Sequence, residues 1–276
     1  MRAALVQMTG SDDPAANTAA VLEHLRSAAA QGAALVATPE VTNCISTSRS
    51  HQRAVLHPEA TDPTLAALRG EARALGLWVL VGSLALLTGD ADGRFANRSF
   101  LIGPDGAIAA RYDKIHMFDV AVSETETYRE SDGFRPGGTA VLARTPLGAL
   151  GLSVCYDLRF PALYRALAQA GAQVLTVPAA FSPVTGAAHW EVLLRARAIE
   201  TGCFVLAPAQ TGIHDAQRGR ARRTHGHSLV VAPWGEVLLD AGTDPGVHVV
   251  DLDLAQVDEA RRRVPALHHD RAFEAP

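Results

Sequence analysis

Short apolar runs alternate with helical patterns along the whole sequence, and this alternation limits the possible folds more than any other property of the chain. Runs typical of buried strands lie at 1–9, 34–40, 77–87, 173–180, 203–210, 226–242 and 247–254, and apolar residues at helical spacing lie at 14–33, 65–75, 161–172 and 188–202. Two hairpins are also predicted, with turns at 103–106 and 146–148. Strands and helices mixed in this order predict an α/β protein with large mixed sheets that helices cover.

The composition is that of an ordinary globular protein. Hydrophobic residues make up 48% of the 276 positions and charged residues 20%, and neither a repeat nor a low-complexity linker divides the chain. We therefore expect one domain over residues 1–276. The net charge of −4 gives no reason to expect nucleic acid as a partner, and we interpret the one basic run, at 218–223, as a solvated loop.

The sequence carries no sign of a membrane anchor or of a disulfide framework. Its apolar runs fall short of the roughly 18 residues that a membrane span needs, and its apolar start is too short for a signal peptide. The cysteines Cys44, Cys155 and Cys203 are odd in number and lie outside any Cys-x-x-Cys motif, which argues against disulfides and against a structural zinc site. We expect a cytoplasmic protein with reduced thiols and no membrane partner.

Three chemically reactive side chains follow predicted strands. Glu40 and Cys155 each end an apolar run, and Lys114 lies at the end of the second strand of a predicted hairpin. Taken singly, they have ordinary explanations as a turn carboxylate, a core thiol and a surface charge. Taken together, they supply a nucleophile, its base and a positive donor for a tetrahedral intermediate. Lys114 is also the only lysine in the sequence, and the other 24 of the 25 Lys and Arg residues are arginines.

Several segments resemble the nitrilase superfamily of carbon–nitrogen hydrolases. The segments "TPEVTN", "RYDKIHMFD" and "GLSVCYDLRFPALYRALAQAGA" resemble its three signature regions, and the likeness continues through "PAAFSPVTGAAHWEVLLRARAIE", "GHSLVVAPWGEVL" and "RRRVPALHHDR". The resemblance covers essentially the whole chain. It implies a four-layer α-β-β-α sandwich of the nitrilase type that assembles as a homodimer or a larger homo-oligomer. It also implies that Glu40, Lys114 and Cys155 form a catalytic triad.

The same resemblance suggests further site residues. Amidase branches of the family have a second glutamate about 25 residues before the cysteine, a position that Glu130 fits; the alternative is that Glu124, Glu126 and Glu130 form one acidic surface loop. The backbone N–H of Tyr156, with Lys114, is expected to hold the oxyanion. Arg159 is expected to bind a substrate carboxylate, with a structural salt bridge as the alternative.

The implied activity is hydrolysis of a small carboxylated amide, without metal or organic cofactor. Cys155 would attack the amide and form an acyl-thioester while Glu40 takes its proton, and ammonia or an amine would leave. The segments resemble the amidase branch that acts on deaminated glutathione, which we favour as substrate. The alternatives are an omega-amidase acting on α-ketoglutaramate or α-ketosuccinamate, a nitrilase, a thiol peroxidase and a catalytically silent scaffold.

Some positions depart from the pattern of the related amidases, and they bear on the substrate more than on the chemistry. His225 stands where those amidases commonly have Tyr, Ala232 stands where they often have Asp, and the segment 212–225 is rich in arginine. His225 and His227 are expected to alternate on a strand, but no third ligand accompanies them, so we do not expect a metal site.

Overall fold

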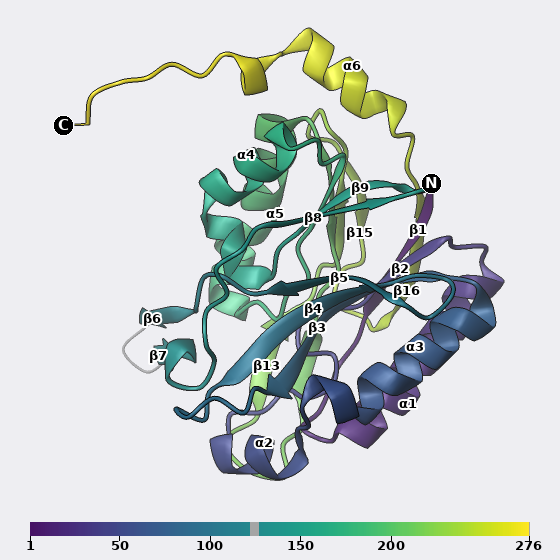
Figure 1. Cartoon of the computed structure of the whole chain (residues 1–276), viewed down its shortest axis with the longest axis vertical. Helices are drawn as coiled ribbons and strands as arrows, with labels where there is room; N and C mark the ends of the chain where they lie inside the picture. Colours follow the sequence, from purple (N-terminus) through teal and green to yellow (C-terminus); the bar gives the residue numbers. More distant parts are fainter. Residues whose placement is uncertain (122–126, 276) are drawn as a thin grey trace.

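The computed structural model describes residues 1–121 and 127–275, in which two six-stranded mixed sheets form the centre of the molecule (Figure 1). The strands of the first sheet, in spatial order, are β16 (Gly246–Asp251), β1 (Arg2–Gln7), β2 (Leu35–Ala37), β3 (Trp78–Leu87), β4 (Phe95–Ile102) and β5 (Ile108–Asp113). Those of the second are β15 (Val237–Asp240), β14 (Leu229–Val231), β11 (Phe204–Ala207), β10 (Val174–Thr176), β9 (Gly148–Leu152) and β8 (Val141–Thr145). The three strands β1, β2 and β3 run parallel, as do β9, β10 and β11, and the outer strands pair antiparallel.

Helices cover the outer face of each sheet. Figure 1 shows α1 (Pro14–Ala30) and α3 (Pro63–Leu75) on one side of the molecule, and α4 (Pro161–Gln169) and α5 (Pro183–Thr201) on the other. The helix α6 (Ala255–Arg263) follows the last strand. This arrangement confirms the predicted α-β-β-α sandwich.

The alternation of side chains along β1 explains why the layers form. Ala3 and Leu5 belong to the core between the two sheets, whereas Ala4 and Val6 belong to a second core under α1 and α3. A strand that is apolar on both faces must be covered on both, so each sheet needs a second sheet on one face and helices on the other.

Helix ends follow signals that are visible in the sequence. The Asp13 carboxylate caps α1 by accepting hydrogen bonds from the N–H groups of Ala15 and Ala16, and Asp62 caps α3 in the same way through Leu65. Each aspartate is followed by a proline at the first helical position, where the missing N–H costs nothing.

Some elements were not predicted, and two expectations need correction. The additional elements are α2 (Arg49–Val55), the pairs β6 (Asp119–Ala121) with β7 (Thr127–Arg129) and β12 (Thr211–His214) with β13 (Arg222–His225), and 3-10 turns at Glu59–Thr61, Glu130–Asp132, Cys155–Arg159 and Ala266–His268. The run 218–223 is not wholly a solvated loop, because Arg222 begins β13 and is half-buried. His225 and His227 do not alternate on one strand, because β13 ends at His225 and His227 adopts a left-handed backbone with φ 55°.

Among the described residues, no helix is both long enough and apolar enough to cross a membrane.

Candidate active site

Glu40, Lys114 and Cys155 come together in one cavity between the two sheets. Glu40 follows β2 and Lys114 follows β5, both in the first sheet, whereas Cys155 follows β9 in the second. All three side chains line the cavity, and all three are buried, with exposed fractions of 4%, 2% and 7%. The remaining lining residues include Asn97, Glu130, Tyr156, Phe181, Thr185, Arg49, Arg129, Arg220 and Arg222.

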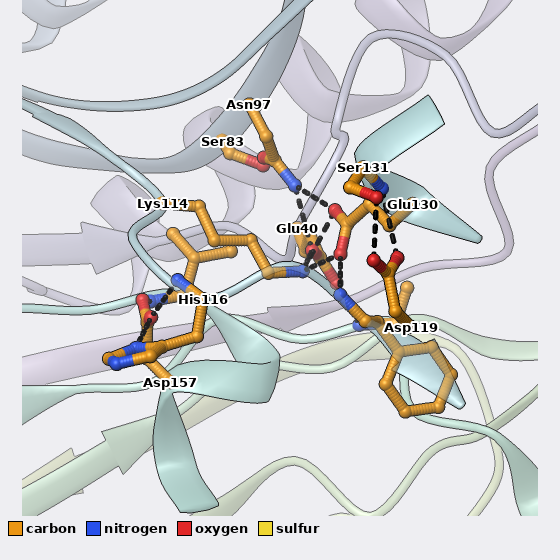
Figure 2. A network of polar contacts seen from close by, with 12 residues as sticks. Glu40, Ser83, Asn97, Lys114, His116, Asp119, Glu130, Ser131 and Asp157 are labelled. Atoms are coloured by element: carbon orange, nitrogen blue, oxygen red, sulfur yellow. Dashed lines mark hydrogen bonds and ion pairs between the residues drawn. The ribbon is translucent and has the colours of Figure 1, made fainter. Parts of the chain in front are cut away.

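The Lys114 ammonium lies between two carboxylates (Figure 2). Its Nζ is 2.9 Å from Glu40 Oε1, and 3.0 and 2.8 Å from the two carboxylate oxygens of Glu130. Burial alone would lower the pKa of this ammonium, but the charges of Glu130 and Glu40 outweigh burial and raise that pKa well above its ordinary value. The lysine is therefore a permanent positive charge at neutral pH.

Glu40 is held by three donors. Its Oε1 accepts from Lys114 and from Asn97 Nδ2 at 2.9 Å, and its Oε2 accepts from the N–H of Ala180 at 2.9 Å. Burial alone would raise the pKa of this carboxyl, but the charge and hydrogen bond of Lys114, together with the charge of Arg222, hold that pKa below its ordinary value. Glu40 is therefore ionised and ready to accept a proton.

Cys155 occupies a strained turn. Its φ of 49° lies in the left-handed region that non-glycine residues rarely adopt, and its N–H donates to Pro178 O at 2.9 Å. Burial and the Glu40 charge raise the pKa of its thiol well above the ordinary value, and the Lys114 charge offsets this only in part. The resting pair is thus a neutral thiol beside an ionised carboxylate, so the thiolate forms as the thiol attacks.

Glu130 also faces the cavity, where it contacts Lys114 and the backbone. Its Oε2 accepts from the N–H of Phe118 at 2.7 Å, and its Oε1 accepts from Asn97 Nδ2 at 3.3 Å. Glu130 thus belongs to the same polar network as the three predicted residues. Glu124 and Glu126, the other acids of the predicted loop, lie outside the described residues.

Asp157 connects the segment that carries Lys114 to the turn that carries Cys155. Its Oδ1 accepts from the backbone N–H of His116 at 3.0 Å and lies 2.7 Å from the His116 ring Nδ1. Its Oδ2 accepts from the Tyr112 hydroxyl at 2.7 Å and from the N–H of Val154 at 2.9 Å. Asp157 is fully buried, so these contacts are shielded from water.

The two remaining predicted residues lie differently with respect to the cavity. Tyr156 lines it, but Arg159 does not. The Arg159 guanidinium lies over the rings of Tyr156 and Phe181, at 5.9 and 5.5 Å from their centroids, and contacts His189 Nδ1 at 3.3 Å. Among the described residues it forms no ion pair, so the alternative of a structural salt bridge finds no support there. Carboxylate binding by Arg159 stays a prediction.

Sequence reasoning missed three residues of the cavity wall. Asn97 lies within β4 and gave no signal, and Arg49 begins α2, a helix without a periodic apolar pattern. Arg222 belongs to the basic run 218–223, and it was missed because we interpreted that run as a solvated loop.

The described part of the chain holds no group of three or more His, Cys, Asp or Glu side chains placed to bind a metal ion. His225 and His227 stack with ring centroids 4.6 Å apart, and His227 Nδ1 lies 2.9 Å from Asp240 Oδ1. Two histidines and one carboxylate in this arrangement are a stacked pair, one ring of which contacts a carboxylate.

Comparison with known proteins gives a consistent family assignment. The carbon–nitrogen hydrolase family model matches residues 2–262. A deaminated glutathione amidase of Yersinia enterocolitica is 39% identical over 271 residues, which cover 97% of this chain and 92% of that protein. The C. elegans NitFhit crystal structure superposes with a TM-score of 0.90 and 35% identity, over 98% of this chain and 65% of that one. Saccharomyces cerevisiae Nit3, a member of branch 10 of the nitrilase superfamily, superposes with a TM-score of 0.85 and 28% identity, over 99% of this chain and 97% of that one. The chain belongs to the carbon–nitrogen hydrolase family.

Proposed function

We propose that this protein is an amidase that hydrolyses deaminated glutathione through a thioester on Cys155. The observation that carries the proposal is the buried cluster of an ionised carboxylate, an ammonium and a thiol at Glu40, Lys114 and Cys155. The substrate is suggested by relatives named deaminated glutathione amidase, which are about 39% identical over nearly the whole chain.

Acylation uses each member of the cluster once. The Cys155 sulfur attacks the amide carbonyl while Glu40 takes the thiol proton, and general-base help of this kind contributes about 10²–10⁴-fold. Lys114 and the backbone N–H of Tyr156 hold the resulting oxyanion. Glu40 then returns its proton to the amide nitrogen, the C–N bond breaks, and the amine leaves behind an acyl-thioester.

Deacylation uses the same base. Glu40 takes a proton from water as the water attacks the thioester carbonyl, and Glu130 helps to position the reactants. The C–S bond then breaks, the carboxylic acid leaves, and Glu40 returns the proton to the Cys155 sulfur. The ammonium of Lys114 has three N–H donors and lies within 3.0 Å of three carboxylate oxygens. One of these three contacts must therefore be given up when Lys114 donates to the oxyanion.

The chemistry of the substrate fits a cationic cavity. Deaminated glutathione is glutathione in which a keto oxygen replaces the α-amino group. It carries a carboxylate in the keto-acid half and another on the glycine, with the scissile amide between them. Hydrolysis yields 2-oxoglutarate and cysteinylglycine.

The test is product release from a panel of substrates. Deaminated glutathione, α-ketoglutaramate, α-ketosuccinamate, a matched nitrile and glutamine are compared by kcat/KM, with Cys155→Ala as the inactive control. We expect the highest kcat/KM for deaminated glutathione and a mass adduct of the keto-acyl group on Cys155. A preference for α-ketoglutaramate would identify an omega-amidase, and a preference for the nitrile would identify a nitrilase.

We further propose that residues 1–276 form one domain and that it pairs with a second copy in the cytoplasm. Three large apolar side chains along α5, Val184, Val192 and Ile199, are exposed by 57%, 67% and 57%. Trp234 and Val264 lie near its end and are also exposed, at 45% and 55%. An apolar surface of this kind supports an interface between copies. Light scattering should give a mass above that of the 29.1 kDa chain, and Val192→Glu should lower it.

A further inference from the structure

The cavity around Cys155 contains more positive charge than the reaction needs. Lys114 and four arginines line the wall, whereas Glu40 and Glu130 are the only carboxylates among the described lining residues, so five positive side chains face two negative ones. Arg129 and Arg220 are exposed, so water screens their charges, whereas Arg49 and Arg222 are half-buried. These two half-buried guanidinium groups require an explanation.

Arg49 is held in place without a carboxylate partner. Its Nη1 donates to Gln52 Oε1 at 3.0 Å, and its guanidinium carbon lies 5.0 Å from the centroid of the Phe134 ring. Burial lowers the pKa of this guanidinium, which indicates that the surroundings do not fully compensate its charge. Within residues 1–121 and 127–275 Arg49 forms no ion pair, although arginines at ten other positions there pair with carboxylates.

Arg222 lies in another part of the wall, beside the catalytic base. Its Nη2 donates to Ala180 O at 2.7 Å, and the N–H of the same Ala180 donates to Glu40 Oε2 at 2.9 Å. Arg222 likewise makes no ion pair among the described residues. Thr185 follows Ala180 by five residues and also lines the cavity. Its buried hydroxyl has no hydrogen-bond partner among the described residues.

We propose that Arg49 and Arg222 each bind one carboxylate of a dicarboxylate substrate, so that the scissile amide lies between them at Cys155. This inference rests on the proposed function and specifies how the cavity recognises its substrate. Glu40 acts on Arg222, and Glu130 and Asp132 act on Arg49, only from beyond ion-pair distance. A substrate carboxylate that accepts two parallel N–H bonds would neutralise each half-buried guanidinium directly. Arg159 does not line the cavity, and carboxylate binding by that residue stays a separate prediction.

The test compares two cavity variants with two matched controls. Arg49→Met and Arg222→Met remove the charge and keep an unbranched side chain, and Arg53→Met and Arg223→Met do the same at exposed positions of the same helix and the same strand. For deaminated glutathione we expect KM to rise about 10- to 100-fold in each cavity variant, because a charge-assisted contact is lost. The controls should stay within about twofold of the parent, a spread typical of exposed positions. α-Ketoglutaramate carries one carboxylate, so its KM should respond to one cavity variant and not to both.

A second readout does not depend on turnover. Binding of 2-oxoglutarate, the keto-acid product, is measured by calorimetry on the same five proteins. Its second carboxylate is the former amide carbonyl at Cys155, so its affinity should fall in the one cavity variant that also raises KM for α-ketoglutaramate, and not in the other. If the parent hydrolyses deaminated glutathione while KM and 2-oxoglutarate binding in both cavity variants match the parent, the two-arginine site is wrong and the proposed function stands. If the parent does not hydrolyse deaminated glutathione but one cavity variant loses 2-oxoglutarate, the proposed substrate is wrong and the carboxylate site at that arginine stands.

Discussion

Asp157→Asn should lower both stability and kcat, although the two side chains have nearly the same shape. Each Asp157 oxygen accepts a backbone N–H, from His116 on one side and from Val154 on the other. In the variant, the amide NH₂ must replace one of these oxygens, and whichever way it turns, one buried N–H faces another donor. The Tyr112 hydroxyl can turn to accept a hydrogen bond, but a backbone N–H cannot.

The magnitude follows from one unpaired buried donor. Leaving such a group unsatisfied costs about 1–3 kcal/mol. For a chain of this size, that loss corresponds to a fall in Tm of about 2–12 °C. Because the two backbone groups belong to the segments that carry Lys114 and Cys155, we expect kcat to fall at least tenfold while KM changes less.

Thermal melting and steady-state kinetics on the same preparation check this prediction. Asp251→Asn is the matched control, since that carboxylate is 71% exposed and its pair with Arg2 should contribute little. A Tm within 1 °C of the parent together with kcat within twofold would refute the idea that Asp157 fixes the two segments relative to each other.

Other substitutions test the catalytic cluster itself. Lys114→Arg should reduce kcat by about 10²–10³-fold, since the broader guanidinium cannot occupy the Nζ position between Glu40 and Glu130; kcat within threefold of the parent would contradict this. Because the pKa of Glu40 lies below its ordinary 4.5, Glu40 stays ionised down to that pH. We therefore expect kcat/KM to stay level as pH falls to about 4.5 and to decline only below it, and the stability contributed by the ion pair with Lys114 should be lost over the same range. A decline in kcat/KM centred near pH 6 would point to another group. Cys155→Ala should abolish turnover with an unchanged circular dichroism spectrum, whereas Cys203→Ala should keep most activity, and equal losses in both would argue against a unique nucleophile. Glu130→Gln should impair turnover with ordinary circular dichroism, and full activity would leave Glu130 without a role in the reaction.

The parts of the site that the sequence predicts are those that local pattern determines. Glu40, Lys114 and Cys155 each follow a strand, so apolar runs that end in reactive groups made them candidates together, and the family resemblance assigned them as a triad. The family resemblance added Glu130, which no local pattern distinguishes from other acids.

The parts that escaped prediction depend on contacts between distant segments. Asn97 reaches Glu40 and Glu130 only because β4 lies between β3 and β5 in the sheet. Arg222 reaches the cavity because β13 lies close enough to residue 180 for its guanidinium to bind that backbone carbonyl. Neither proximity follows from spacing along the chain. The order of strands and helices predicted mixed sheets covered by helices, and the family resemblance supplied the four-layer arrangement.

The proposed two-arginine site would divide the work between the two large sheets and the smaller elements around the cavity. The groups assigned to bond breaking follow strands of the two sheets, where the surrounding core allows little change. Arg49 and Arg222 instead belong to α2 and β13, and neither element is part of either large sheet. A substitution or a change of length in α2 or in the hairpin β12–β13 can therefore alter the choice of substrate while the reacting groups keep their positions. Engineering of this scaffold toward other amides should begin in those two segments.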